Sequence, residues 1–211
     1  YILMEKGLFI TLEGVDGSGK STQANALEKS LNKNGNIAVL TREPGGSVGA
    51  ELIRKLLVEG DPDRWSPETE MLLFTAARRD HFEKTIRPAL EKGKIVISDR
   101  FADSTRVYQG ATRGDLRAVV DQLHQLMIGY EPDLTLIIDV DPEESLSRGL
   151  ARDSGEDRFE DFGLDFQKKL REGFLKLGHD FNKRCKIIDG TRSVKDISSE
   201  ILTLVYTKLN D

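Results

Sequence analysis

The octapeptide Gly14-Val15-Asp16-Gly17-Ser18-Gly19-Lys20-Ser21 decides the fold, because it matches the pattern G-x-x-x-x-G-K-[ST] at every required position. An apolar and β-branched run at residues 8–12 precedes it and is typical of a buried strand. Apolar residues recur at helical spacing from Ala24 to Leu31, which predicts an amphipathic helix that begins near Lys20. In such a unit the glycines turn backbone N–H groups toward phosphate oxygens, and the helix N-terminus adds partial positive charge. The sequence therefore predicts a nucleotide-binding loop.

Individual positions of this loop carry separate roles in phosphate chemistry. We expect Lys20 to reach the β- and γ-phosphates of ATP, and the Ser21 hydroxyl to bind Mg²⁺. The other loop residues and Thr22 complete the candidate ATP site. The alternative is a glycine-rich turn that binds nothing, and the flanking strand and helix patterns argue against it.

Length, charge and cysteine content exclude several classes of protein. A chain of 211 residues can form one α/β domain, and no repeat or linker divides residues 1–211. The net charge of −5 disfavours a nucleic-acid-binding surface, which normally presents a basic face. The single cysteine, Cys185, rules out an internal disulfide and suits a reducing compartment. No apolar run is long enough to cross a membrane, so we expect a cytoplasmic protein without a membrane partner.

Apolar runs that alternate with helical patterns organise the rest of the chain. Five runs predict strands: residues 8–12, 37–41, 95–98, 134–138 and 185–188. This alternation predicts an α/β, P-loop NTPase-type three-layer fold, with a central five-stranded parallel sheet and helices on both faces. We expect one long helix over residues 66–91, capped by Ser66 and kinked or shortened at Pro88. Residues 101–114 are predicted as a helix broken by a loop, and the charged segment 151–163 as a mobile lid.

Charged residues directly follow several of the predicted strands. The phosphate-binding loop, Arg42, the pair Asp99-Arg100 and the turn at residues 189–192 all fall at such positions. Open parallel sheets bind ligands along the carboxyl ends of their strands. We therefore expect Arg42 and Arg100 to hold an acidic acceptor by bidentate contacts beside the loop. Ordinary surface ion pairing is the alternative for both arginines.

The chain lacks the sequence features of a GTP-dependent switch. Such a protein needs N-K-x-D to bind the base, and Asn182-Lys183-Arg184-Cys185 lacks the aspartate. The pattern D-x-x-G occurs only inside the phosphate-binding loop. A kinase needs instead a second site that holds an acceptor in line with the γ-phosphate. The arginines at the strand ends favour a kinase.

Six stretches, in order along nearly the whole chain, resemble the bacterial thymidylate kinase family. They are residues 9–22, Thr41-Arg42-Glu43-Pro44-Gly45-Gly46, Phe74-Thr75-Ala76-Ala77-Arg78, Ser98-Asp99-Arg100-Phe101 through Tyr108-Gln109-Gly110, Pro132-Asp133-Leu134-Thr135 and Asp157-Arg158-Phe159-Glu160. The second and fourth are specific to that family, whereas the phosphate-binding loop is not. The resemblance implies that a homodimer transfers the γ-phosphate of ATP to dTMP, giving dTDP and ADP in dTTP biosynthesis.

The resemblance also implies which residues bind the acceptor. Phe74 and Arg78 stand four apart, so they project from one helix face; the family assigns Phe74 to stacking on thymine and Arg78 to the edge of the base. Core packing is the alternative for Phe74. Asp16 matches the carboxylate that contacts the acceptor 3′-hydroxyl, and Tyr108 matches the ring that crowds a ribose 2′-hydroxyl. The further dTMP ligands are Ser104 and Thr105, which could also cap a helix, and Glu160.

Asp99 and the arginines of the charged segment are the remaining candidates for catalysis. The resemblance places Asp99 near the metal, where it acts through a Mg²⁺-bound water or orients the acceptor. Residues 16–18 contain no arginine, unlike family members that carry a catalytic arginine there. We therefore expect the missing cation to come from Arg152 or Arg158 in the lid, with Arg148 also available.

Several positions stay open at this point. Arg192 follows the last predicted strand and is either an adenine contact or a surface residue. Arg113 has no assigned role, and no metal-ligand spacing or acid–base partner is recognisable for His81, His124 or His179. The alternative enzyme is a related nucleoside or nucleoside-monophosphate kinase with another acceptor. The alternative from a different class is a nucleotide-dependent regulatory protein without transfer activity.

Overall fold

The computed structural model of the chain describes residues 7–61, 64–112, 115–150 and 163–210. Five strands form one sheet in the order β2-β3-β1-β4-β5, and each neighbouring pair is parallel. The strands are β1 (Phe9–Glu13), β2 (Ala38–Arg42), β3 (Ile95–Asp99), β4 (Leu134–Asp139) and β5 (Cys185–Asp189). The predicted five-stranded parallel sheet is confirmed, with small shifts in the strand bounds.

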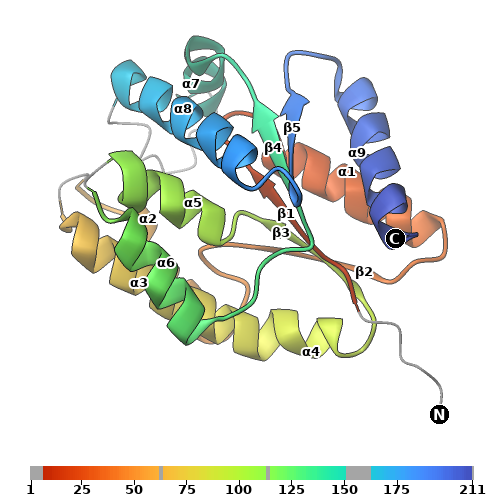
Figure 1. Cartoon of the computed structure of the whole chain (residues 1–211), viewed down its shortest axis with the longest axis horizontal. Helices are drawn as coiled ribbons and strands as arrows, with labels where there is room; N and C mark the ends of the chain where they lie inside the picture. The colour runs from red at the N-terminus through yellow and green to blue at the C-terminus, as the bar shows by residue number, and fades with distance from the viewer. Residues whose placement is uncertain (1–6, 62–63, 113–114, 151–162, 211) are drawn as a thin grey trace.

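Helices cover both faces of this sheet (Figure 1). Their bounds are α1 Lys20–Lys33, α2 Val48–Val58, α3 Pro67–His81, α4 Arg87–Leu90, α5 Ala102–Val107, α6 Arg117–Met127, α7 Pro142–Leu150, α8 Leu164–Asp180 and α9 Val194–Leu209. Helices α1 and α9 pack together on one face, and α4, α5 and α8 contribute to the cores on the other. No helix within the described ranges is long and apolar enough to span a bilayer.

Successive side chains of β1 fill the two faces alternately, as the pleat of a strand requires. Ile10 and Leu12 are fully buried in the core that α1 and α9 share with the sheet. Phe9 lies in a different core and packs edge-on against Phe101, with 4.9 Å between ring centroids. The sheet therefore separates apolar cores on its two faces, which gives the predicted three-layer fold.

The long helix predicted over residues 66–91 is divided by a wider turn. It begins as expected, since the Ser66 hydroxyl accepts a hydrogen bond from the Thr69 N–H. Between α3 and α4, however, lies a π-helical segment, Phe82–Ile86. Pro88 has no N–H for the carbonyl four residues before it, and its ring crowds that carbonyl, so the wider turn accommodates the proline.

The prediction of a helix broken by a loop over residues 101–114 is wrong for the described part of that segment. Helix α5 continues directly into a π-helical segment, Tyr108–Thr112. Gly110 suggested a break, but a Cβ there would lie 3.2 Å from the Cα of Arg117. The glycine therefore allows close packing against α6 rather than a loop. Residues 113–114 lie outside the described ranges, so Arg113 keeps no assigned role.

The sheet brings three functional segments to one edge. Asp99 at the end of β3 pairs in register with Leu12 of β1 and with Arg42 of β2. The phosphate-binding loop follows β1 and therefore lies beside the end of β3, with the end of β2 one strand further along the sheet. Such an edge, next to the point where the strand order reverses, is where open α/β sheets bind ligands. The predicted lid lies outside the described residues, except for Gly163.

Candidate active site

A cavity of about 290 Å³ lies at this edge of the sheet. Small-molecule sites typically have volumes of roughly 300–1,000 Å³, so the cavity is near the lower end of that range. Residues predicted for the ATP, metal and acceptor sites line it together: Asp16, Lys20, Ser21, Arg42, Phe74, Arg78, Asp99, Arg100, Ser104, Thr105 and Tyr108. The structure thus brings most of the described site candidates into one place.

The backbone of the phosphate-binding loop depends on its glycines. Gly14, Gly17 and Gly19 have φ angles of 136°, 80° and 95°, which side chains rarely tolerate. The hydroxyl of Ser18 is buried and has no hydrogen-bond partner among the described residues. An unsatisfied buried hydroxyl in a loop of this shape fits a segment that takes up an anion. Thr22 is exposed in the first turn of α1.

Lys20 lies across this loop at the start of α1. Its Nζ donates a hydrogen bond to the carbonyl oxygen of Val15 at 2.7 Å, and the residue is buried. Burial lowers the pKa of Lys20 to about 8, and the positive charge of Arg100 acts in the same direction. Keeping Lys20 protonated at this buried position therefore costs free energy, and a bound phosphate would offset that cost.

The two predicted metal ligands both line the cavity and contact each other. The Ser21 hydroxyl donates to Oδ2 of Asp99 at 2.5 Å. Hydroxyl and carboxylate oxygens suit Mg²⁺, which usually takes one or two carboxylates and completes its shell with substrate phosphates and water. The pair therefore fits Mg²⁺ that arrives with a nucleotide. In the described parts of the chain no group of three or more His, Cys, Asp or Glu residues could hold a metal ion alone.

Arg100 connects the phosphate-binding loop with α5 and the segment after it. Its Nη2 donates to Oδ1 of Asp16 at 2.5 Å and to the hydroxyl of Tyr108 at 3.2 Å. The Tyr108 hydroxyl in turn donates to Oδ2 of Asp16 at 2.9 Å. Burial alone would raise the pKa of Asp16, but Arg100 and Lys20 hold that pKa well below its usual value. The cluster therefore keeps an ionised Asp16 next to a fixed guanidinium group.

Arg78 lies deep in the wall of the cavity. Its Nε donates to Oε2 of Glu43 at 2.7 Å, and its Nη2 donates to the Thr105 hydroxyl at 2.9 Å and the Phe101 carbonyl oxygen at 3.1 Å. Burial opposes ionisation of Glu43, but Arg78 and His81 lower its pKa below the usual value. Arg78 is thus held on several sides, and Phe74 of the same helix lines the same cavity.

No acid–base partner for His81 or His124 was recognisable in the sequence, but the structure shows one for each. Nδ1 of His81 lies 3.0 Å from Oε1 of Glu43, and its Nε2 lies 2.7 Å from the Thr41 hydroxyl. Nε2 of His124 lies 3.2 Å from Oε1 of Glu131. Both rings are buried. The partners of His81 lie 38 and 40 positions away, so spacing along the sequence could not reveal them. Glu131 follows His124 across the turn after α6, and no helical or strand spacing marks that pair.

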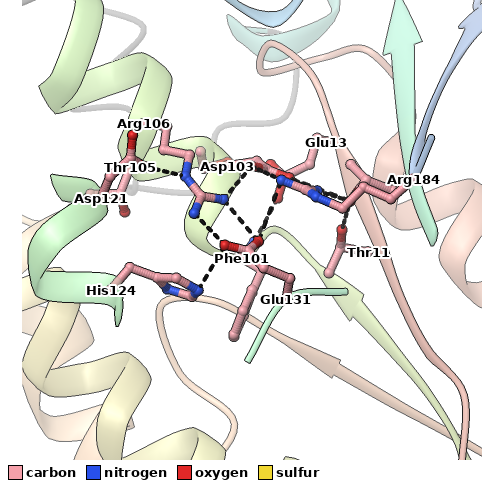
Figure 2. Close-up of polar contacts among 12 residues, drawn as sticks. Thr11, Glu13, Phe101, Asp103, Thr105, Arg106, Asp121, His124, Glu131 and Arg184 are labelled. Carbon is pink, nitrogen blue, oxygen red and sulfur yellow. Dashed lines mark hydrogen bonds and ion pairs between the residues drawn. The ribbon is translucent and has the colours of Figure 1, made fainter. Parts of the chain in front are cut away.

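His124 belongs to a second polar network, centred on the buried Asp103 (Figure 2). Asp103 pairs with Arg106 at 2.7 Å and with Arg184 at 2.6 Å, and Glu131 also pairs with Arg106. None of these five residues lines the cavity. The network joins α5 to α6 and to the start of β5, and so fixes the helix that carries Ser104 and Thr105.

Ser104 and Thr105 are not free to act as simple helix caps. The Ser104 hydroxyl accepts from Nη1 of Arg100 at 2.9 Å, just as that of Thr105 accepts from Arg78. Both residues therefore support the arginines of the cavity. Arg42 lines the cavity with a side chain that is 55% exposed and pairs with Glu51 at 3.3 Å.

The other predicted site residues lie elsewhere or are not described. Arg192 pairs with Glu200 and Asp189 and does not line the cavity. Arg152, Arg158 and Glu160 lie outside the described residues, as does the side chain of Arg148. Their assignments stay predictions from the sequence.

Three polar residues of the cavity were not singled out as ligands from the sequence: Glu43, Arg54 and Gln109. Arg54 Nη1 donates to the carbonyl oxygen of Pro44 at 2.5 Å. Gln109 donates to Oε2 of Glu70 at 3.1 Å, while its own Oε1 is buried without a described partner. Glu43 and Gln109 belong to the two family-specific stretches, so those motifs held the signal. Arg54 lies in neither stretch, and no sequence motif indicates that it lines the cavity.

A phosphate-binding loop and an arginine-lined acceptor cavity at one edge of a parallel sheet define a P-loop phosphotransferase. The chain belongs to the thymidylate kinase family, because the model of the family described as thymidylate kinase matches residues 12–201.

Comparisons with individual proteins agree with this membership. The chain is 65% identical over 200 residues to the thymidylate kinase of Dinoroseobacter shibae, covering 95% of this chain and 97% of that protein. It is 61% identical over 204 residues to the thymidylate kinase of Ruegeria pomeroyi, covering 97% of each. A crystal structure of thymidylate kinase from Ehrlichia chaffeensis superimposes with a TM-score of 0.77 at 37% identity, covering 95% and 98% of the two chains. The predicted family and fold class are confirmed.

Proposed function

We propose that this chain transfers the γ-phosphate of ATP to dTMP, giving dTDP and ADP. The observation that carries the proposal is that Lys20, Arg42 and Arg100 line one cavity. Membership of the thymidylate kinase family supports this activity and this acceptor. Two anions brought face to face in a cavity need cations on both sides, which these residues provide.

On the donor side, the loop amides and Lys20 hold the ATP phosphates. The glycine-rich backbone supplies N–H groups, and the N-terminus of α1 adds partial positive charge. Ser21 and Asp99 would hold Mg²⁺ that arrives with ATP, and the ion would neutralise charge on the phosphate oxygens. Asp99 is not needed as a base, because the acceptor phosphate is already ionised.

On the acceptor side, Arg42 and Arg100 hold the phosphate of dTMP while α3 holds the base. Phe74 stacks on thymine, and Arg78, fixed by Glu43, hydrogen-bonds to its edge. Gln109 offers a buried amide oxygen in the same cavity and complements this contact. Tyr108, fixed on Asp16, occupies the position that crowds a ribose 2′-hydroxyl. The remaining cation comes from Arg152 or Arg158, and Glu160 completes the acceptor ligands.

A homodimer fits one surface of the molecule. Helices α2, α3 and α6 lie together at one side of the sheet (Figure 1), and α3 packs against both of the others. All three carry large apolar side chains that are exposed. We call this surface the apolar face, and it comprises Val48, Leu52, Leu56, Leu72, Val119, Leu126 and Met127. Exposed large apolar side chains that gather on neighbouring helices favour an interaction surface. We propose that a second copy of this chain covers the apolar face, which places a symmetric interface beside the acceptor site.

A coupled assay of ADP release tests the proposed reaction. ATP would be combined with dTMP, dUMP, dCMP, AMP or thymidine, and we expect the highest kcat/KM with dTMP. Strong preference for another acceptor would replace the substrate assignment with that of a related kinase. ATP binding without acceptor-dependent ADP release, and no heat of dTMP binding in calorimetry, would indicate a regulatory nucleotide-binding protein.

A further inference from the structure

Arg100 occupies an unusual backbone conformation. Its φ of 72° is the only positive φ of a non-glycine residue in the described ranges. That region is disfavoured for side chains with a Cβ atom and persists only where surrounding contacts enforce it. The residues that enforce it therefore determine where the guanidinium group lies.

Two side chains hold the peptide group that joins Arg100 to Phe101. At its carbonyl end, the Ser98 hydroxyl donates to the Arg100 oxygen at 2.7 Å. At its amide end, the Phe101 N–H donates to Oε1 of Glu13 at 2.8 Å. The same Phe101 residue accepts from Arg78 through its carbonyl oxygen. The Glu13 carboxyl group thus anchors a turn that both acceptor-site arginines use.

Glu13 also reaches the side chain of Arg100 indirectly. The Ser104 hydroxyl donates to Oε2 of Glu13 at 2.6 Å and accepts from Nη1 of Arg100 at 2.9 Å. Glu13 is the last residue of β1, is fully buried and does not line the cavity. Figure 2 shows it next to Asp103. It therefore touches no substrate and can act only through its neighbours.

We propose that Glu13 is a positioning residue for phosphoryl transfer, whose carboxyl group fixes the Arg100–Phe101 turn and Ser104 and so sets the Arg100 guanidinium in the acceptor site. The inference rests on the proposed function, because it requires Arg100 to hold the acceptor phosphate. The role depends on reach and hydrogen bonding and not on negative charge. Burial and nearby Asp103 raise the pKa of Glu13 to about 8, which favours a neutral carboxyl group near pH 7. In that form the carboxyl group still has an oxygen that accepts from the Phe101 N–H, and the hydrogen bond between Glu13 and Ser104 can run in either direction, because each group then has both an O–H and a lone pair.

Two conservative variants separate reach from charge. Glu13→Gln keeps the length of the side chain, one acceptor for the Phe101 N–H and one donor for Ser104. Glu13→Asp keeps the carboxylate but is one methylene shorter, so it cannot reach both partners. We expect the kcat and the dTMP KM of Glu13→Gln to stay within about threefold of the wild-type values. We expect Glu13→Asp to raise the KM for dTMP about tenfold and lower kcat, with the KM for ATP changed less than twofold.

Thr11→Val is the matched control. Thr11 is a fully buried polar residue of the same strand, and its hydroxyl contacts Thr135 instead of the cavity. Its replacement is expected to lower the melting temperature without changing either KM. A double-mutant cycle adds a second readout: if Glu13 acts through Ser104, the Glu13→Asp effect on the dTMP KM becomes smaller in a Ser104→Ala background.

The steady-state constants and melting temperatures of these variants decide the inference. It is overturned if Glu13→Asp leaves the dTMP KM unchanged, if both KM values rise together, or if Glu13→Gln is as impaired as Glu13→Asp. Wild-type protein is assayed first with ATP and dTMP. An inactive wild type would overturn the proposed function and this inference with it, whereas an active wild type with unresponsive Glu13 variants would overturn only the positioning role.

Discussion

His81 and Glu43 are joined by a buried contact of 3.0 Å between Nδ1 and Oε1. The same carboxyl group forms a 2.7 Å ion pair with Nε of Arg78 through its other oxygen. With Thr41 donating to Nε2, a neutral ring can donate to Glu43 from Nδ1. The histidine therefore orients the carboxylate that orients the arginine assigned to the base.

Replacing His81 should weaken acceptor binding selectively. We expect His81→Ala to raise the KM for dTMP about threefold to tenfold with little change in the KM for ATP, because a charge-assisted contact of Glu43 is lost. Steady-state kinetics with each substrate varied in turn provide the measurement. His179→Ala, at an exposed position of α8, is the control. Equal changes in both KM values would argue against the relay from His81 to Arg78.

Removal of a lid arginine should affect turnover more than binding. We expect Arg152→Ala or Arg158→Ala to lower kcat by about 10³-fold while changing the dTMP KM much less, since a cation that closes over the phosphates acts mainly in the transition state. Lys168→Ala, an exposed cation of α8, serves as the comparison. Unchanged kcat in both arginine variants would remove the lid from the mechanism.

The apolar face predicts how the assembly responds to charge. Leu52 is 64% exposed in α2, so Leu52→Lys should place a charge in the interface between two copies. We expect wild-type protein to sediment with twice the chain mass of 23.6 kDa and the variant to shift toward the monomer. Ile37→Lys, at a residue that is also 64% exposed but precedes β2, should leave the mass unchanged. A monomeric wild type at micromolar concentration would contradict the proposed dimer.

The free energy of unfolding should depend on pH through the titration of Glu13. Its pKa is raised from 4.5 to about 8 in the folded chain by burial and by Asp103, against the opposing influence of Arg100. Between those values the folded state binds more protons at this site than the unfolded state, so this contribution to stability is complete below pH 4.5 and is lost as pH rises toward 8.

Urea unfolding across that range measures the effect. The free energy of unfolding of wild type, taken relative to Glu13→Gln, should fall steadily with rising pH, because the variant lacks this titration while Lys20 and the other groups are common to both. A constant or rising difference would show that Glu13 is ionised in the folded chain.

The fold was predictable because its signals are local. The loop around Lys20 and the apolar runs at the five strands occupy consecutive residues, and short-range periodicity is sufficient to find them. The π-helical segment after His81 and the packing of Gly110 on Arg117 were missed, since the same residues suggest a kink or a loop until their partners are known.

The site was predictable only in part, because some of its contacts are local in sequence and others are not. Arg100, Phe74 and Arg78 belong to motifs with a family signature, and the structure places all three at one cavity. Glu13 lies 91 positions from Ser104, and His81 lies 38 positions from Glu43. Contacts of this range follow from the strand order and not from spacing along the chain.

The central claim is that a phosphoryl group passes directly between two anions held by Lys20 and Arg100. Single-turnover transfer from ATP labelled at the γ-phosphate, in wild type and in Arg100→Ala, tests it most directly. We expect the label to appear in dTDP with wild type and the transfer to slow by about 100-fold or more in the variant, because a buried charged contact to the acceptor is lost. Label released only as inorganic phosphate, or equal transfer rates in the two proteins, would contradict the account.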